Sequence, residues 1–213
     1  MRHQLAALLT GNLLIAPALA LPAPDAAAAL RVEGFLAELS SLRAEFRQTV
    51  TDTHGRVLEQ AEGKVSLARP GRFRWDYRVP EQVIVSDGRT VWLYDVELAQ
   101  VTVRTAGEAL AGTPAMLLAG EGDLNADFEI TDAGHQDGLD WSRLTPRRTD
   151  GDFREVRLGF AGRDLKRMTF LDRLGQTTEL ELFRLERNPR FDSSLFRFEP
   201  PPGADVVGRS PAT

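Results

Sequence analysis

The sequence predicts a mainly β protein with a few helices, an α+β fold in which one antiparallel sheet curves strongly or forms a barrel. Many short segments alternate between apolar and polar residues, which is the period of a strand with one buried face. Turn signals such as Asp87-Gly88 and Asp137-Gly138 separate these segments, as they do in hairpins. One helix near the start and one in the middle are expected to cover the open side of the sheet.

Residues 1–20 differ in composition from the rest of the chain. Met1-Arg2-His3 is a short positive start, residues 5–15 are mostly apolar, and Ala18-Leu19-Ala20 fits a small-residue cleavage site. We interpret this stretch as a secretory signal peptide, with a disordered tag or an uncleaved anchor as the alternative. Residues 21–213 then form a single domain, since they contain no repeat, linker or second composition.

Composition excludes several classes of protein. The chain has no cysteine, so it has neither a disulfide framework nor the lipidated cysteine of a bacterial lipoprotein. Removal of Arg2 with the signal leaves 25 basic residues against 31 acidic ones, a net charge of −6. No basic stripe stands out, which argues against nucleic-acid binding. A soluble, exported protein is the expectation.

The first predicted element is a helix from Asp25, which can cap it, into Leu39. Apolar residues then fall near helical spacing at Leu30, Val32, Phe35, Leu36 and Leu39. This stripe is typical of a helix that packs on a sheet.

Strands are predicted wherever the period of two appears. They cover residues 42–50, 57–67, 73–78, 83–85, 91–95, 100–104, 128–131, 139–144, 153–160, 165–171, 177–185 and 196–198. The strand at 91–95 has Trp92 and Tyr94 on one face and apolar residues on the other, so both of its sides are expected to be covered. The proline run at 200–202 is expected to end the fold.

An aromatic strand at 73–78 is the centre of the sequence. Phe73, Trp75 and Tyr77 share one face, which makes a wide apolar wall. If this strand continues back through Pro70-Gly71, Arg69 shares that face, where a guanidinium needs acceptors because desolvating an unpaired charge costs several kcal/mol. Ordinary core packing is the alternative interpretation of the aromatic residues.

A short helix is predicted between residues 113 and 120. Thr113-Pro114 resembles a helix start, Met116, Leu117 and Leu118 are apolar, and Gly120 is a natural stop. Such a helix is too short to be stable alone. We therefore expect it to lie on the aromatic wall.

Signatures of catalysis and metal binding are weak, which predicts a non-enzymatic protein without metal or cofactor. His54 and His135 lie in turn-like contexts without a nucleophile beside them. The spacing Asp123-x-Asn125-x-Asp127 resembles half a calcium loop, but it lacks the required glycine and the final glutamate.

Several segments together resemble one known family. They are Phe46-Arg47-Gln48, Arg69-Pro70-Gly71-Arg72-Phe73-Arg74-Trp75, Val85-Ser86-Asp87-Gly88, Val91-Trp92-Leu93-Tyr94-Asp95, Gln100-Val101, Thr113-Pro114-x-Met116-Leu117-Leu118 and Phe196-x-Phe198-x-Pro200-Pro201. On these segments the chain resembles the LolA family of periplasmic lipoprotein carriers. The resemblance covers most of the exported chain.

The resemblance implies an unclosed antiparallel β-barrel covered by a lid of short helices, with lipoprotein acyl chains bound between them. It implies a monomer loaded by an inner-membrane ABC-type releasing complex (LolCDE-like) that delivers to an outer-membrane receptor lipoprotein (LolB-like). Arg69 takes the place of the family's lid latch, and Phe73 that of its barrel-wall aromatic. The expected cavity residues are Phe46, Phe73, Trp75, Trp92 and Tyr94, and the expected lid helix holds Met116, Leu117 and Leu118.

The predicted function is therefore a periplasmic carrier that takes lipoproteins to the outer membrane. A carrier of another lipid on the same fold, such as a glycolipid or a hopanoid-like molecule, is an alternative. A periplasmic enzyme or a purely structural envelope domain is a third. The missing catalytic constellation argues against an enzyme, and the unexplained Arg69 argues against a structural role alone.

Overall fold

We analysed a computed structural model of the chain, which describes residues 23–107, 118–119, 124–148 and 151–208. The helices whose full bounds fall within these ranges are α1 (Pro24–Ala37) and α4 (Leu124–Asp127), with a 3-10 helix η1 (Ser193–Phe196). Its strands are β1 (Ser41–Thr51), β2 (Val57–Ala68), β3 (Arg72–Val79), β4 (Glu81–Asp87), β5 (Thr90–Asp95), β6 (Gln100–Thr105), β7 (Phe128–Gln136), β8 (Leu139–Pro146), β9 (Phe153–Ala161), β10 (Asp164–Asp172), β11 (Thr177–Arg187) and β12 (Asp205–Gly208).

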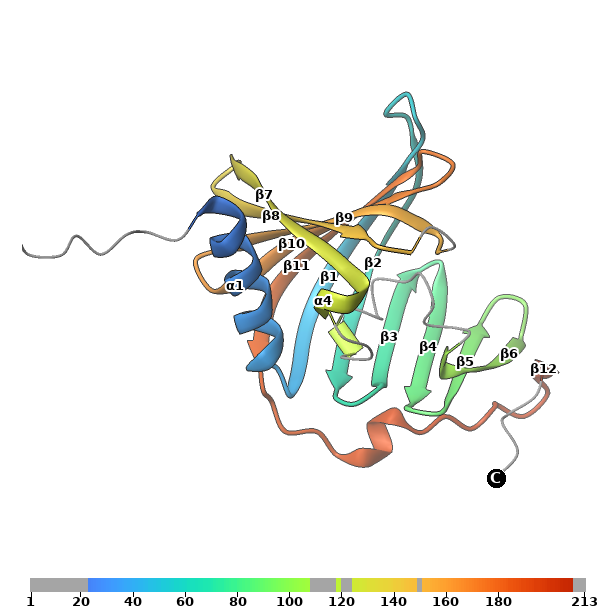
Figure 1. Cartoon of the computed structure of the whole chain (residues 1–213). Helices are drawn as coiled ribbons and strands as arrows, with labels where there is room; N and C mark the ends of the chain where they lie inside the picture. The colour runs from blue at the N-terminus through green and yellow to red at the C-terminus, as the bar shows by residue number, and fades with distance from the viewer. Residues whose placement is uncertain (1–22, 108–117, 120–123, 149–150, 209–213) are drawn as a thin grey trace, which may run out of the picture.

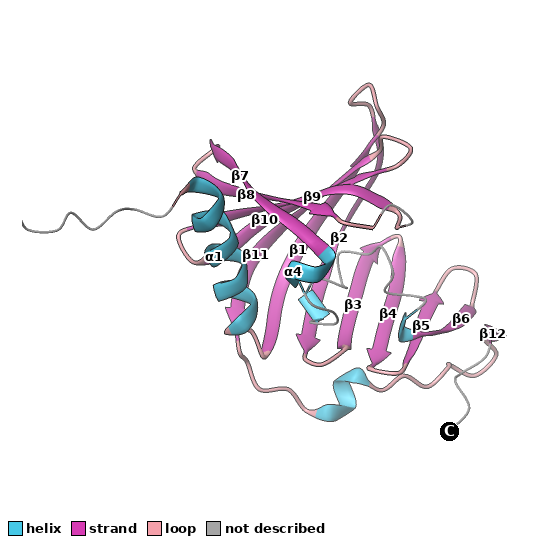
Figure 2. Cartoon of the chain, viewed as in Figure 1, coloured by secondary structure: helices cyan, strands magenta, loops and turns pink. Residues whose placement is uncertain are grey.

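Within the described ranges, the strands form one twelve-stranded sheet in the order β12-β6-β5-β4-β3-β2-β1-β11-β10-β9-β8-β7. Neighbouring strands are antiparallel except β12, which pairs with β6 in parallel. The sheet curves strongly, β7 and β8 fold across its concave side, and α1 lies beside them (Figure 1). Figure 2 shows how few helices accompany the strands. The prediction of a mainly β, unclosed and curved antiparallel sheet is confirmed.

Two expectations about the C-terminal end were wrong. Residues 196–198 do not form a strand, because Asp192 accepts a hydrogen bond from the Ser194 amide and starts η1, which buries Phe196. The proline run at 200–202 does not end the fold either. The chain turns after it, and the Asp205 amide donates to the Ala99 carbonyl as β12 begins. Within the part described here, residues 189–208 form what we call the C-terminal segment.

The first helix begins without the predicted side-chain cap. Its N-cap is Ala23, and Pro24 stands in the first turn, where the missing N–H would have no partner in any case. The Asp25 carboxylate instead accepts from the Asp132 amide of β7, at 2.8 Å. This contact covers a backbone donor on an edge strand, a group that would otherwise be free to pair with another chain.

Strand register assigns side chains to the two faces of the sheet. One face, which we call the inner face, carries the predicted aromatic wall and most of the buried core. Three successive rows of it are Leu42-Leu67-Phe73-Ser86-Val91, then Ala44-Val65-Trp75-Ile84-Leu93, then Leu182-Phe46-Gly63-Tyr77-Gln82-Asp95. Helix α1 closes one side of this core, where Phe35 meets Phe160 edge-on with ring centroids 5.6 Å apart.

Gly63 is where β2, β3 and the aromatic residues come closest. A Cβ added there would lie 2.0 Å from the Asp76 carbonyl oxygen and 3.0 Å from the Phe46 ring. Because the nearer atom belongs to the backbone, it cannot move aside without disturbing the β2–β3 pairing.

We expect Gly63→Ala to lower the free energy of unfolding by about 2 kcal/mol or more, since the overlap forces a backbone shift. Gly34→Ala is the matched control: nothing lies within 4 Å of a Cβ at this position in α1. It should raise stability by about 0.5–1 kcal/mol through helix propensity. Denaturant unfolding followed by circular dichroism measures both, and equal effects of the two variants would contradict the prediction.

Candidate lipid-binding face and its arginine latch

Arg69 lies in the turn between β2 and β3, not on the aromatic strand itself. The turn nevertheless brings the Arg69 side chain to the side of the sheet that carries the aromatic wall, next to α1 and residues 118–119. Nε donates to the Leu118 carbonyl at 2.9 Å, and Nη1 donates to the Leu36 carbonyl at 2.7 Å. The Gly71 amide adds a bond to the Ala119 carbonyl at 3.3 Å.

The Leu118 and Leu36 carbonyls are the acceptors that a guanidinium beside the apolar wall requires. Burial lowers the pKa of the Arg69 guanidinium from an ordinary value so high that the group remains charged. Leu36 lies in the last turn of α1, where the helix dipole favours a cation, and its carbonyl also accepts from the Leu39 amide at 3.3 Å. The bridge between Leu36 and Leu118 was not foreseen, because nothing in the sequence indicates that α1 ends beside Arg69.

Residues 118 and 119 are the described part of the predicted lid helix. Both are helical, and Leu118 and Ala119 are buried within the cluster that contains Phe73 and Trp75. The expected lid residues Met116 and Leu117 lie outside the described residues. The described contacts therefore place one end of the predicted lid segment in the apolar core and within reach of Arg69.

The aromatic wall consists of four side chains from β1 and β3. Phe46 meets Trp75 edge-on at 4.9 Å and Tyr77 at 5.0 Å between ring centroids, and Trp75 stacks on Tyr77 at 6.3 Å. Phe73 continues the same face and is 2% exposed. The structure thus brings together the expected cavity residues Phe46, Phe73 and Trp75 with Tyr77, the third aromatic residue of the predicted wall.

Trp92 and Tyr94 do not belong to this wall, which corrects the sequence prediction. Register places Trp92 beside Val85 and Tyr94 beside Val83, on the face opposite Phe73 and Trp75. Both rings instead pack against Phe198 of the C-terminal segment, with centroids 6.3 and 5.9 Å apart. The expectation that both sides of this strand are covered is met, with the C-terminal segment as the outer cover.

Tyr77 supplies a test of the environment at the wall. Burial, together with the negative charge of Glu59, raises the pKa of the Tyr77 hydroxyl from 10.0 to about 12. The folded protein therefore keeps the Tyr77 proton at pH values where the unfolded chain loses it. The stabilisation that the folded protein gains from a protonated Tyr77 is complete below pH 10 and is lost as pH rises toward 12.

The chain has two tyrosines, so Tyr94→Phe leaves Tyr77 as the single tyrosine that titrates. We expect the ultraviolet absorbance of ionised tyrosine in this variant to rise with a midpoint at about pH 12. The reciprocal variant, Tyr77→Phe, removes the titration of the buried hydroxyl and serves as the comparison. A midpoint near pH 10 in the Tyr94→Phe protein would show that Tyr77 is solvated.

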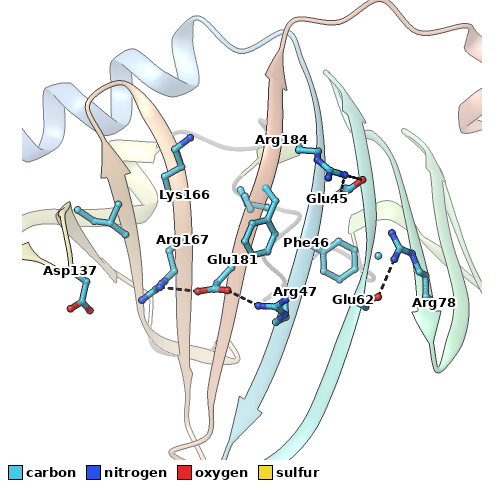
Figure 3. Close-up of a pocket in the computed structure, with 14 residues that line it drawn as sticks. Glu45, Phe46, Arg47, Glu62, Arg78, Asp137, Lys166, Arg167, Glu181 and Arg184 are labelled. Carbon is cyan, nitrogen blue, oxygen red and sulfur yellow. Dashed lines mark hydrogen bonds and ion pairs between the residues drawn. The ribbon is translucent and has the colours of Figure 1, made fainter.

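A hollow of about 680 Å³ has a character different from that of the apolar inner face (Figure 3). It lies mainly on the outer face and is lined chiefly by charged side chains that pair with one another. The pairs are Arg167–Glu181 at 2.8 Å, Arg47–Glu181 at 3.5 Å, Arg78–Glu62 at 3.0 Å and Arg184–Glu45 at 2.9 Å. Such a surface does not suit hydrocarbon, so this hollow is not a candidate for the lipid site.

Metal-ligand geometry is absent from the described residues, which hold no group of three or more His, Asp or Glu side chains placed around one point. Asp123 of the partial calcium motif lies outside the described residues, and the Asn125 amide donates to Glu33 of α1 at 2.7 Å. His135 pairs with Asp140 at 2.8 Å, and His54 contacts Thr53. Among the described helices, none is long and apolar enough to cross a membrane.

An apolar inner face with a helical segment packed on it, held through Arg69, is the arrangement expected of a carrier of apolar ligands. Comparison with known proteins gives the same class. A family model described as "Outer membrane lipoprotein carrier protein LolA" matches residues 37–199. The chain belongs to this family. Its members are periplasmic lipoprotein carriers and not enzymes, so the predicted class and location are confirmed.

Individual relatives support the assignment. The outer-membrane lipoprotein carrier protein of Dechloromonas aromatica is 44% identical over 179 residues, covering 84% of this chain and 86% of its own. That of Methylibium petroleiphilum is 42% identical and covers 92% and 97%. The crystal structure of an uncharacterized conserved protein from Thermus thermophilus has a TM-score of 0.53 at 18% identity, covering 86% of this chain and 98% of that one. This last likeness concerns the fold alone.

Proposed function

We propose that the inner face binds the acyl chains of lipoproteins and that the lid segment around Leu118 fills this space when cargo is absent. The observation that carries the proposal is the position of Leu118: its side chain lies in the core beside the aromatic wall while its carbonyl is held by Arg69. An acyl chain that displaced this segment would meet the apolar rows of β1–β5.

The energetics favour a carrier that is covered when empty. Each buried methylene contributes about 0.8 kcal/mol, so a lipid anchor has to be kept from water during transfer. An uncovered apolar cavity would expose a patch prone to association. A lid that takes the place of the cargo keeps the empty cavity covered and still leaves room for the lipid. Arg69 supports such a lid by favouring the closed state. Bound cargo is then held weakly enough to pass to a receptor.

The partners follow from this role. The described ranges contain no nucleotide-binding loop, so a donor such as a LolCDE-like ABC-type complex in the inner membrane would provide the energy for loading. A LolB-like receptor lipoprotein in the outer membrane would accept the cargo from a monomeric carrier. Residues 1–20 would direct export as a signal peptide and leave residues 21–213 as one carrier domain.

The test is release of a lipoprotein from its membrane. The mature protein is incubated with ATP-energised inner membranes that carry a tagged lipoprotein, and the soluble fraction is examined for a complex. We expect an ATP-dependent soluble complex. If an established carrier extracts the lipoprotein in parallel and this protein does not, the proposal is wrong. Mass spectrometry of lipids bound to the native protein would then identify another cargo.

A further inference from the structure

The inner face changes from apolar to polar at one level of the wall. In the row through Trp75, every side chain from β1 to β5 is apolar. One row nearer the β1–β2 hairpin, Tyr77 is followed by Gln82 and Asp95 across β4 and β5. Gln48, two residues beyond Phe46 on β1, continues the change of polarity.

The change is local and is not simply the solvated end of every strand. Gln48 pairs with Leu180 of β11, which pairs with Met168 of β10, which in turn pairs with Leu158 of β9. The side chains of these three partners are at most 2% exposed. At the level of Gln48, the inner face is therefore dry and apolar from β11 to β9, and the next residue in the row, Ser142 of β8, is buried and donates to the Ala28 carbonyl of α1. The other polar groups lie on the remaining half of the inner face, beside the aromatic wall.

Gln48 and Tyr77 form a neutral donor pair within this polar group. The Tyr77 hydroxyl donates to Gln48 Oε1 over 3.4 Å, which is long for an O–H···O bond. Among the described residues, the amide nitrogen of Gln48 has no hydrogen-bond partner. The buried Tyr77 hydroxyl makes one long bond and is ready to donate to a stronger acceptor, because a weak bond in a low-polarity site is costly. The half-buried Gln48 amide nitrogen reaches solvent and can exchange water for the same acceptor.

The negative charges near Gln48 and Tyr77 limit which chemical group of a ligand could accept these hydrogen bonds. Glu59 lies close enough to raise the pKa of Tyr77, and Asp95 lies in the same row as Tyr77 and Gln82. These two carboxylates near Tyr77 would repel a negatively charged ligand group such as a phosphate or a free fatty-acid carboxylate. A neutral carbonyl oxygen remains favourable. Every acyl chain ends in such a carbonyl where it is joined by an ester or an amide bond.

We propose that Gln48 and Tyr77 donate hydrogen bonds to the ester or amide carbonyls that join the acyl chains to the lipidated end of the cargo. This inference rests on the proposed function, since it requires the acyl chains to lie along the apolar rows below. The aromatic wall then accommodates the hydrocarbon, and the Gln48–Tyr77 pair fixes how deeply the chains enter. The same pair distinguishes an acylated ligand from one that is merely apolar.

The test compares two lipopeptides on the mature protein and its variants. One has a terminal cysteine with ester-linked acyl chains, and the other is the matched ether-linked analogue without those carbonyls. We expect the wild type to bind the ester compound about 3–10-fold more tightly, as one or two net hydrogen bonds imply. Tyr77→Phe and Gln48→Met should each reduce this preference toward one by weakening the binding of the ester compound.

Tyr94→Phe is the matched control, because it removes a hydroxyl from the outer face and should keep the full preference. If Tyr77→Phe and Gln48→Met both keep the wild-type preference while all proteins bind the ester compound, the inference is overturned and the carrier function stands. If the wild type binds neither compound, the proposed function fails and the inference fails with it.

Discussion

Phe73→Glu is expected to abolish loading, with the soluble lipoprotein complex reduced at least tenfold relative to wild type. Phe73 is 2% exposed and pairs with Leu67 and Ser86 on the inner face. A carboxylate there would have no cationic partner within its row. Burying an isolated charge costs several kcal/mol, so the cavity would hydrate or repack and lose its affinity for hydrocarbon.

The measurement is the release assay with ATP-energised membranes, after circular dichroism has shown that the variant is folded. Phe73→Leu keeps an apolar side chain at the site and should load. Val79→Glu places the same charge at an exposed position on the same strand and should also load. A folded Phe73→Glu protein that extracts lipoprotein as well as wild type would show that the inner face is not the cargo site.

Arg69→Leu is expected to separate loading from delivery. The variant loses both the bond to the Leu36 carbonyl and the bond to the Leu118 carbonyl, so the side chain at this position of the β2–β3 turn no longer ties the lid segment to α1. Hydrogen bonds from a charged donor contribute about 1.5–3 kcal/mol each. The closed state would then no longer compete with bound cargo, and transfer to a receptor should slow by tenfold or more while loading persists.

A two-stage assay measures this effect: extraction of tagged lipoprotein from membranes, followed by transfer to outer membranes that carry the receptor. Arg78→Leu makes the same change at an exposed position and removes a surface pair with Glu62, so it should deliver normally. Transfer by Arg69→Leu at the wild-type rate would mean that Arg69 serves stability alone and that the latch model is wrong.

Local pattern predicted the strands well because their information is local. Alternation of apolar and polar residues requires only neighbouring positions, and the hairpin turns depend on a few Gly, Asp and Asn residues. The face shared by Phe73, Trp75 and Tyr77 follows from parity within one strand. The same local reasoning also identified Arg69 as a charge that needs acceptors, since burial of an unpaired guanidinium is unfavourable wherever it occurs.

Local pattern was not sufficient where the outcome depended on register between strands. Trp92 and Tyr94 are aromatic and alternate like the wall residues, yet they lie on the outer face. Each hairpin between β3 and β5 sets which residues stand opposite one another, and a shift of one residue moves a whole strand face to the other side. The C-terminal segment that covers them is also distant in sequence, so its contact with them through Phe198 had no local signal.

By itself, the sequence determined the class of fold, the aromatic face of one strand and the resemblance to lipoprotein carriers. The tertiary structure decided what those parts meet. Arg69 reaches the Leu36 carbonyl because the C-terminal end of α1 lies beside the β2–β3 turn, and β12 joins β6 because the C-terminal segment runs along the edge of the sheet (Figure 1). Gln48 of β1 contacts Tyr77 of β3 for the same reason. Contacts between distant segments depend on how the whole core packs, whereas a residue pattern carries information only about neighbouring positions.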